Sequence, residues 1–169
     1  MHKRAAHWGF AVLFATLGAL PAAAQSVRLI GEYRDWSAYS ATEGAGALCF
    51  AMSLPKEVTP TPEGFTQAYL YLTNRPSEGV ASEFNLVAGF PFQAGAPATV
   101  TVGGQVFQLF TESDSAWLLD PATSSGLASA IRAGSTLTVD GVSAAGVAVT
   151  QIFSLSGATA AQRAIEGGC

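Results

Sequence analysis

The chain has 169 residues and a formal net charge of −4 at pH 7, and hydrophobic residues make up 49% of it while charged residues make up 12%. That length suits one domain with a substantial apolar core. The excess of Asp and Glu (12) over Lys and Arg (8) opposes binding to a phosphate backbone, so no nucleic-acid partner is expected.

The first 24 residues have the layout of a secretory signal peptide. A basic start, "MHKR", precedes the apolar run "AAHWGFAVLFATLGAL", and small residues end at Ala24. Cleavage is therefore expected after Ala24, with a retained membrane anchor as the alternative because the apolar run approaches a spanning length. Residues 25–169 then form the exported domain, which has no further apolar run of spanning length and is expected in the periplasm or outside the cell.

Removing the leader changes the chemistry that the chain offers. Both histidines and two basic residues leave with it, so the net charge falls from −4 to −6. Without histidine, the Ser-His-Asp and Cys-His catalytic designs are excluded, and two thiols alone do not make a metal site. The glycine-containing stretches lack the lysine of a phosphate-binding loop. We expect no catalytic residue, no metal and no cofactor.

Two cysteines, Cys49 and Cys169, remain in the exported domain. In an oxidising compartment, an even pair of cysteines most simply forms a disulfide. This bond would join the last residue of the chain to an early strand.

Strand patterns alternate with turn signals along most of residues 32–155. In chain order, strands are expected within 32–41, 47–54, 65–76, 82–92, 98–110 (a hairpin), 115–120, 135–141 and 146–155. Three prolines within 55–64 predict a loop, and apolar residues at helical spacing predict short helices within 121–134 and 157–168. The sequence thus predicts a mainly β fold, a single-domain β-sandwich or partly closed β-barrel with two short helices.

One pair of residues has the spacing of a catalytic site. Ser53 stands three residues before Lys56 in "SLPK", as in serine hydrolases of the penicillin-recognising type. That geometry requires a helix, and Pro55 together with the strand-like residues before it argues against one. A serine hydrolase using Ser53 and Lys56 is therefore an alternative hypothesis.

Other polar and aromatic residues suggest binding. Glu112 and Asp114 are interpreted as solvated surface charges. Trp36 and Trp117 are candidates for stacking on sugars or peptides, although such aromatic residues more often belong to the core. Arg75 ends a strand where it could hold a carboxylate, with an internal ion pair as the preferred interpretation. A small-ligand carrier with an open barrel interior is a further alternative.

Seven segments of the exported chain stand in a distinctive order: "DWSAYS", "LCFAMSLP", "TNRP", "VAGFPF", "AWLLD", "LASAIRAGSTLTVDG" and "FSLSGATAAQRAIEGGC". In this order the chain resembles the invasion-associated locus B family of exported Gram-negative proteins. The resemblance implies a non-enzymatic, periplasmic or envelope-associated β-rich domain, with an unknown envelope or host protein as partner. Some members carry another cysteine after the first tryptophan, and its absence from "DWSAYSA" supports a single bridge between Cys49 and Cys169.

Overall fold

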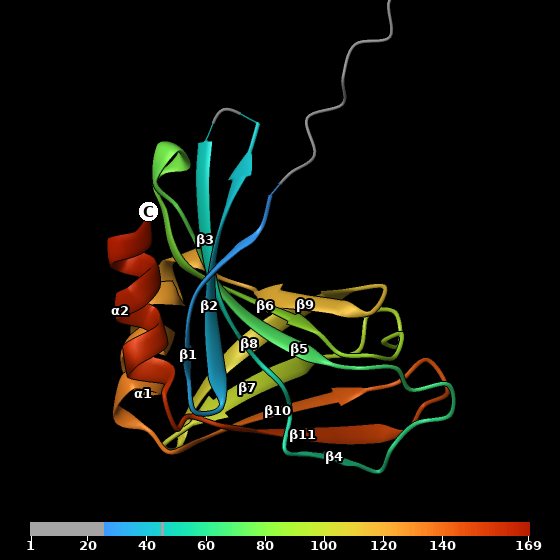
Figure 1. Cartoon of the computed structure of the whole chain (residues 1–169). Coiled ribbons are helices and arrows are strands. Elements are labelled where there is room, and N and C mark those ends of the chain that lie inside the picture. The colour runs from blue at the N-terminus through green and yellow to red at the C-terminus, as the bar shows by residue number, and fades with distance from the viewer. Residues whose placement is uncertain (1–25, 45) are drawn as a thin grey trace, which may run out of the picture.

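The computed structural model describes residues 26–44 and 46–169, so the predicted signal peptide lies outside the described residues. Eleven strands form one antiparallel sheet, and two α-helices lie side by side at one end of it (Figure 1). The fold is mainly β, and the coiled sheet is not closed into a barrel. These findings confirm the predicted fold class.

Most neighbouring strands in the sheet are joined by short connections in the sequence. The order across the sheet is β1-β2-β3-β5-β6-β9-β8-β7-β10-β11-β4. Longer connections join β3 to β5, β6 to β9 and β7 to β10, and β4, which follows β3 along the chain, pairs with β11. The chain therefore crosses from β3, near one edge of the sheet, to β11, near the other edge, before it returns to β5. The strands are β1 Arg28–Tyr33, β2 Trp36–Glu43, β3 Gly46–Ser53, β4 Glu57–Thr59, β5 Tyr69–Arg75, β6 Val80–Val87, β7 Ala98–Val102, β8 Gln105–Glu112, β9 Ser115–Leu118, β10 Thr136–Val142 and β11 Ala148–Ser154.

The inner face of the sheet carries a continuous apolar core. Successive side chains of a strand point to opposite faces, and in β3 Cys49 and Ala51 are buried while Phe50 between them is only partly buried. The largest core side chains, Trp36, Phe84 and Phe153, are each at most 1% exposed. Because these side chains fill the interior, the described residues offer no open barrel for the small-ligand carrier considered above.

Two helices complete the core. Helix α1, Ser124–Ala133, contacts β6 and β7, and helix α2, Ala158–Gly168, contacts β1, β2 and β3. The buried Gln162 of α2 accepts a hydrogen bond of 2.8 Å from Arg132 of α1. Each helix thus buries one apolar face, as their helical spacing predicts.

The beginning of α2 depends on a glycine. Gly157 has a φ of 96°, in the left-handed region, and a Cβ at this position would lie 1.7 Å from the carbonyl oxygen of Tyr33. Only a residue without a side chain permits this approach. The turn between β1 and β2 and the start of α2 are therefore fixed against each other.

The structure corrects the sequence-based elements at two places. Residues 32–41 were predicted as one strand, but the chain turns at Arg34 and Asp35, so β1 and β2 form a hairpin. Arg34 adopts a φ of 58° there, a conformation that a non-glycine residue rarely adopts. The predicted loop 55–64 contains β4, because pairing with β11 extends a segment that has little strand pattern of its own. The described strands consequently number eleven instead of eight or nine.

The predicted disulfide between Cys49 and Cys169 is confirmed. The two Cα atoms are 5.8 Å apart, and the half-cystines are separated by 120 positions in the sequence. A Cβ at Gly168 would lie 2.7 Å from Cδ1 of Ile30, so the glycine before Cys169 allows the close approach. The bond ties the end of α2 to the inner face of β3.

We expect Cys169→Ser to destabilise the protein strongly. In the chain-entropy model a closed loop of about 120 residues contributes roughly 5 kcal/mol, which corresponds to a melting temperature lower by roughly 10–20 °C. Thermal unfolding with and without reductant checks this, and proteolysis should begin at the C-terminus. A melting temperature that neither the variant nor the reductant changes would contradict the structural role of the bond.

Candidate functional site

Aromatic side chains gather on the outer face of the sheet, opposite the core. Tyr39 of β2 pairs in register with Phe50 of β3, and Tyr71 of β5 belongs to a row that continues through Asn85 of β6. The same row ends at Trp117 of β9 and Phe110 of β8. We give the name aromatic band to five of the aromatic residues on this face: Tyr39, Phe50, Tyr71, Trp117 and Phe110.

The rings within the aromatic band contact one another directly. Tyr39 and Phe50 stack with their centroids 5.1 Å apart, and Phe50 meets Tyr71 edge-on at 5.9 Å. Burial raises the pKa of the Tyr71 phenol, and the neighbouring Tyr69 and Tyr39 raise it further. The phenol of Tyr71 therefore stays uncharged at neutral pH.

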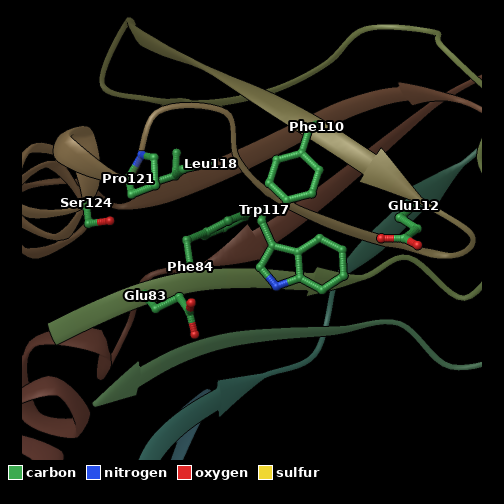
Figure 2. Close-up of a pocket in the computed structure, with 8 residues that line it drawn as sticks. All are labelled: Glu83, Phe84, Phe110, Glu112, Trp117, Leu118, Pro121 and Ser124. Atoms are coloured by element: carbon green, nitrogen blue, oxygen red, sulfur yellow. The ribbon is translucent and has the colours of Figure 1, made fainter. Parts of the chain in front are cut away.

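At the β8 end of the aromatic band the surface opens into a cleft of about 360 Å³. Trp117 lies in the middle of this cleft, stacked on Phe110 with ring centroids 5.3 Å apart (Figure 2). The cleft forms where β9 ends and the chain turns toward α1, which leaves β6 and β8 on its two sides. Its lining residues are Glu83, Phe84, Phe110, Glu112, Trp117, Leu118, Pro121 and Ser124.

The two carboxylates of the cleft have different surroundings. Glu83, on β6, accepts a hydrogen bond of 2.7 Å from the Arg75 guanidinium, so its charge is compensated within the chain. Glu112, on β8, is exposed at the other side of Trp117. Phe110 is 43% exposed. The Trp117 cleft therefore presents aromatic surface and a net negative charge to the solvent.

Two other surface clefts have a similar volume but different chemistry. One, near Pro62 and Phe90, is lined largely by apolar residues together with Glu63 and Ser143. The other is lined by residues that include Asp35, Ser53 and Lys56, and it contains the hydrolase pair considered from the sequence. Of the three, the Trp117 cleft is the one that joins stacked rings to carboxylates.

Ser53 and Lys56 are not arranged as a nucleophile and its base. Ser53 is the last residue of strand β3, is 2% exposed and donates a hydrogen bond of 2.8 Å to the backbone carbonyl of Asp35. Lys56 donates to the Asp35 carboxylate. Both side chains are thus bonded to Asp35, and the required helix is replaced by a strand.

The three candidate binding residues proposed from the sequence lie in different surroundings. Trp36 lies in the core, where its indole N–H donates a 2.9 Å hydrogen bond to the carbonyl of Ser154. Arg75 forms an internal ion pair with Glu83, a residue of the cleft. Trp117 is half-buried and lines the cleft itself. Trp36 is therefore a structural residue, whereas Trp117 and Arg75 belong to one surface site.

Sequence reasoning missed part of this site. Phe110 and Glu83 were not singled out, and Glu112 was treated as an ordinary surface charge. The sequence of β8 did contain a signal for part of the site. Phe110 and Glu112 are two residues apart on one strand, so their side chains share a face of the sheet. The contributions of Glu83 and Pro121 depend on how β6 and the segment after β9 meet, which no local pattern reveals.

Within residues 26–44 and 46–169, no group of three or more His, Cys, Asp or Glu side chains could hold a metal ion. In the same residues, no helix combines the length and apolar character needed to cross a membrane.

Comparison with known proteins gives a family and a fold. The family model described as invasion associated locus B (IalB) protein matches residues 36–166. The crystal structure of invasion associated protein B from Bartonella henselae is similar, with a TM-score of 0.56 and 18% sequence identity. The match covers 82% of this chain and 95% of that chain. No curated protein matches the chain. At this identity, the solved structure demonstrates a shared fold.

The ion pair at Asp35 predicts a dependence of stability on pH. Hydrogen bonds from Lys56 and then from Ser154 hold the pKa of the Asp35 carboxyl below its ordinary value of 3.8, against a smaller opposing effect of burial. A carboxyl whose pKa is lowered by folding stabilises the folded state above its unfolded pKa, and this contribution is lost as the pH falls through the folded pKa.

We therefore expect Asp35→Asn to lower the melting temperature at about pH 6 and to have progressively less effect below about pH 4. Asp114→Asn serves as the control for the loss of one exposed carboxylate. Thermal melts of the three proteins across this pH range make the comparison. An effect of Asp35→Asn that is the same at all pH values would show that the ion pair does not contribute as described.

Proposed function

The chain belongs to the invasion associated locus B family, and from this membership we propose that it is an exported protein of the cell envelope that binds a partner and does not catalyse a reaction. Export is supported by the leader pattern of residues 1–24. It is also supported by the bond between Cys49 and Cys169, since disulfides form and persist mainly in oxidising compartments.

A binding role is favoured over catalysis by the arrangement of the described polar groups. The described residues include no histidine, the side chain that most often serves as a general base. The hydroxyl of Ser53 is bonded to a backbone carbonyl, and the ammonium of Lys56 is bonded to Asp35. The serine hydrolase hypothesis therefore loses the feature on which it rested.

The observation that carries the proposal is the Trp117 cleft. Trp117 and Phe110 stack at the surface, with Phe110 43% exposed. Aromatic residues that combine a rigid ring with partial exposure are enriched where proteins bind one another. The partner in this proposal is a protein of the envelope or of a host cell, the second option resting on the name of the Bartonella henselae protein with the same fold.

Export makes a prediction about the N-terminus. The protein recovered from the periplasmic fraction should begin at, or within two or three residues of, Gln25, because the small residues ending at Ala24 form the expected cleavage site. Intact-mass measurement of the purified protein tests this. Retention of Met1 in the mature protein would instead support the membrane-anchor alternative.

Binding makes a prediction about Trp117. Envelope proteins captured by the wild-type chain should be largely lost from Trp117→Ala, because truncating a central interface tryptophan typically costs at least about 2 kcal/mol, or roughly thirtyfold in affinity. Trp117→Phe should retain part of the binding, and Val147→Ala, at a separate exposed apolar residue, should retain all of it.

The melting temperatures of these variants identify any loss of folding. Equal capture by the wild type and by a folded Trp117→Ala variant would refute the assignment of the binding site.

A further inference from the structure

The Trp117 cleft places an uncompensated carboxylate next to stacked aromatic rings. Glu83 is neutralised by Arg75. The side chain of Glu112 has no hydrogen bond or ion pair with another residue in the described part of the chain. Figure 2 shows Trp117 between these two glutamates, with Phe110 beside it. The electrostatic preference of the cleft is therefore for a positive charge.

The described residues that line the cleft do not supply such a charge. No Lys or Arg is among the residues that line the cleft. Lys56 is bonded to Asp35, and Arg132 is bonded to Gln162 and Ser129 on the helices. The cleft thus leaves room beside Glu112 for a cation supplied by another molecule.

We propose that the Trp117 cleft binds an arginine side chain of a protein partner, with the guanidinium stacked against the Trp117 indole and paired with the Glu112 carboxylate. This inference rests on the binding function proposed above and names the chemistry of that site. A guanidinium is planar, weakly hydrated and suited both to aromatic faces and to carboxylates. The cleft volume of about 360 Å³ lies at the small end of ligand sites and suits one side chain.

Other ligand classes fit the cleft less well. Phosphate-bearing ligands, including anionic lipid headgroups, would be repelled by Glu112 and by the acidic chain as a whole. A neutral sugar can donate hydroxyl hydrogen bonds to Glu112 but leaves its negative charge without a counter-charge, which is a penalty when the cleft is covered. A cation removes this penalty and gains the attraction of the ring faces.

The aromatic band extends the site beyond the arginine. From Trp117, the register row passes through Asn85 to Tyr71, and Tyr71 contacts Phe50. Neighbouring strands are about 4.8 Å apart, so the band offers a surface roughly 20–25 Å long across the sheet. The partner residues on either side of its arginine can pack against the aromatic band. These contacts enlarge an interface that the cleft alone would leave small.

A peptide titration followed by NMR tests the proposal. The probes are acetyl-Gly-Arg-Gly-amide and the same peptide with citrulline, which keeps the shape of arginine but has no charge. The arginine peptide should shift the indole N–H signal of Trp117 saturably, and the citrulline peptide should bind at least about threefold more weakly. The Trp36 indole signal, buried and bonded to Ser154, should stay in place.

Two variants separate the role of Glu112 from general charge effects. Glu112→Gln should weaken arginine binding by about two- to fivefold and leave citrulline binding unchanged. Asp114→Asn, which removes a neighbouring charge outside the cleft, should have little effect. Binding of the arginine peptide should also weaken as NaCl is raised from about 50 mM to about 500 mM.

The proposal is overturned if arginine and citrulline peptides shift the Trp117 signal equally or not at all, or if a chitin-type oligosaccharide or phosphocholine vesicles shift it while the arginine peptide does not. If Trp117→Ala loses its envelope partner and the arginine peptide is nevertheless inert, the binding function stands and the arginine assignment falls. If a folded Trp117→Ala retains the partner, the binding site itself is wrong.

Discussion

The bond between Cys49 and Cys169 is the constraint on which the rest of the structure depends. Helix α2 has 11 residues and buries only a thin stripe formed mainly by Ala158, Ala161 and Ile165. A helix of that length is marginal by itself in water. The covalent bond holds its last turn against β3, while Gly157 fixes its first turn against the carbonyl of Tyr33. The helix is thereby held at both ends.

The position of α2 determines what each face of the sheet can do. With α2 on the inner face of β1, β2 and β3, the small inward side chains of these strands are buried. The outer face is then the one that meets solvent, and it carries the aromatic band. The two tryptophans of the described residues illustrate this division, because Trp36 is 1% exposed in the core while Trp117 lines an open cleft.

Much of the fold could be predicted from the sequence because its signals are local. Alternating runs mark most of the strands, apolar spacing marks the two helices, and an even number of cysteines predicts the bond. The errors occur where tertiary contacts decide the structure. At Arg34 the chain turns through a positive φ, and the sequence has no glycine there to signal the turn. Strand β4 has little strand pattern of its own and forms by pairing with β11.

The candidate site was less accessible from the sequence than the fold. The two tryptophans differ in burial for reasons that the local pattern does not give, because Trp36 begins a strand that faces α2 whereas Trp117 belongs to a row of outward side chains. The spacing of Phe110 and Glu112 indicates a shared face. The sequence alone cannot show that Arg75 neutralises Glu83 and leaves Glu112 as the uncompensated charge.

The central claim is that the outer face at Trp117 meets a partner in the cell. Site-specific photo-crosslinking in living cells tests it most directly, with the photoreactive residue placed at Phe110 or at Val147. These positions are similarly exposed, at 43% and 39%, but only Phe110 lines the Trp117 cleft. The account predicts a discrete crosslinked protein from position 110 and none from position 147. Equal crosslinking from both positions, or none from position 110, would contradict it.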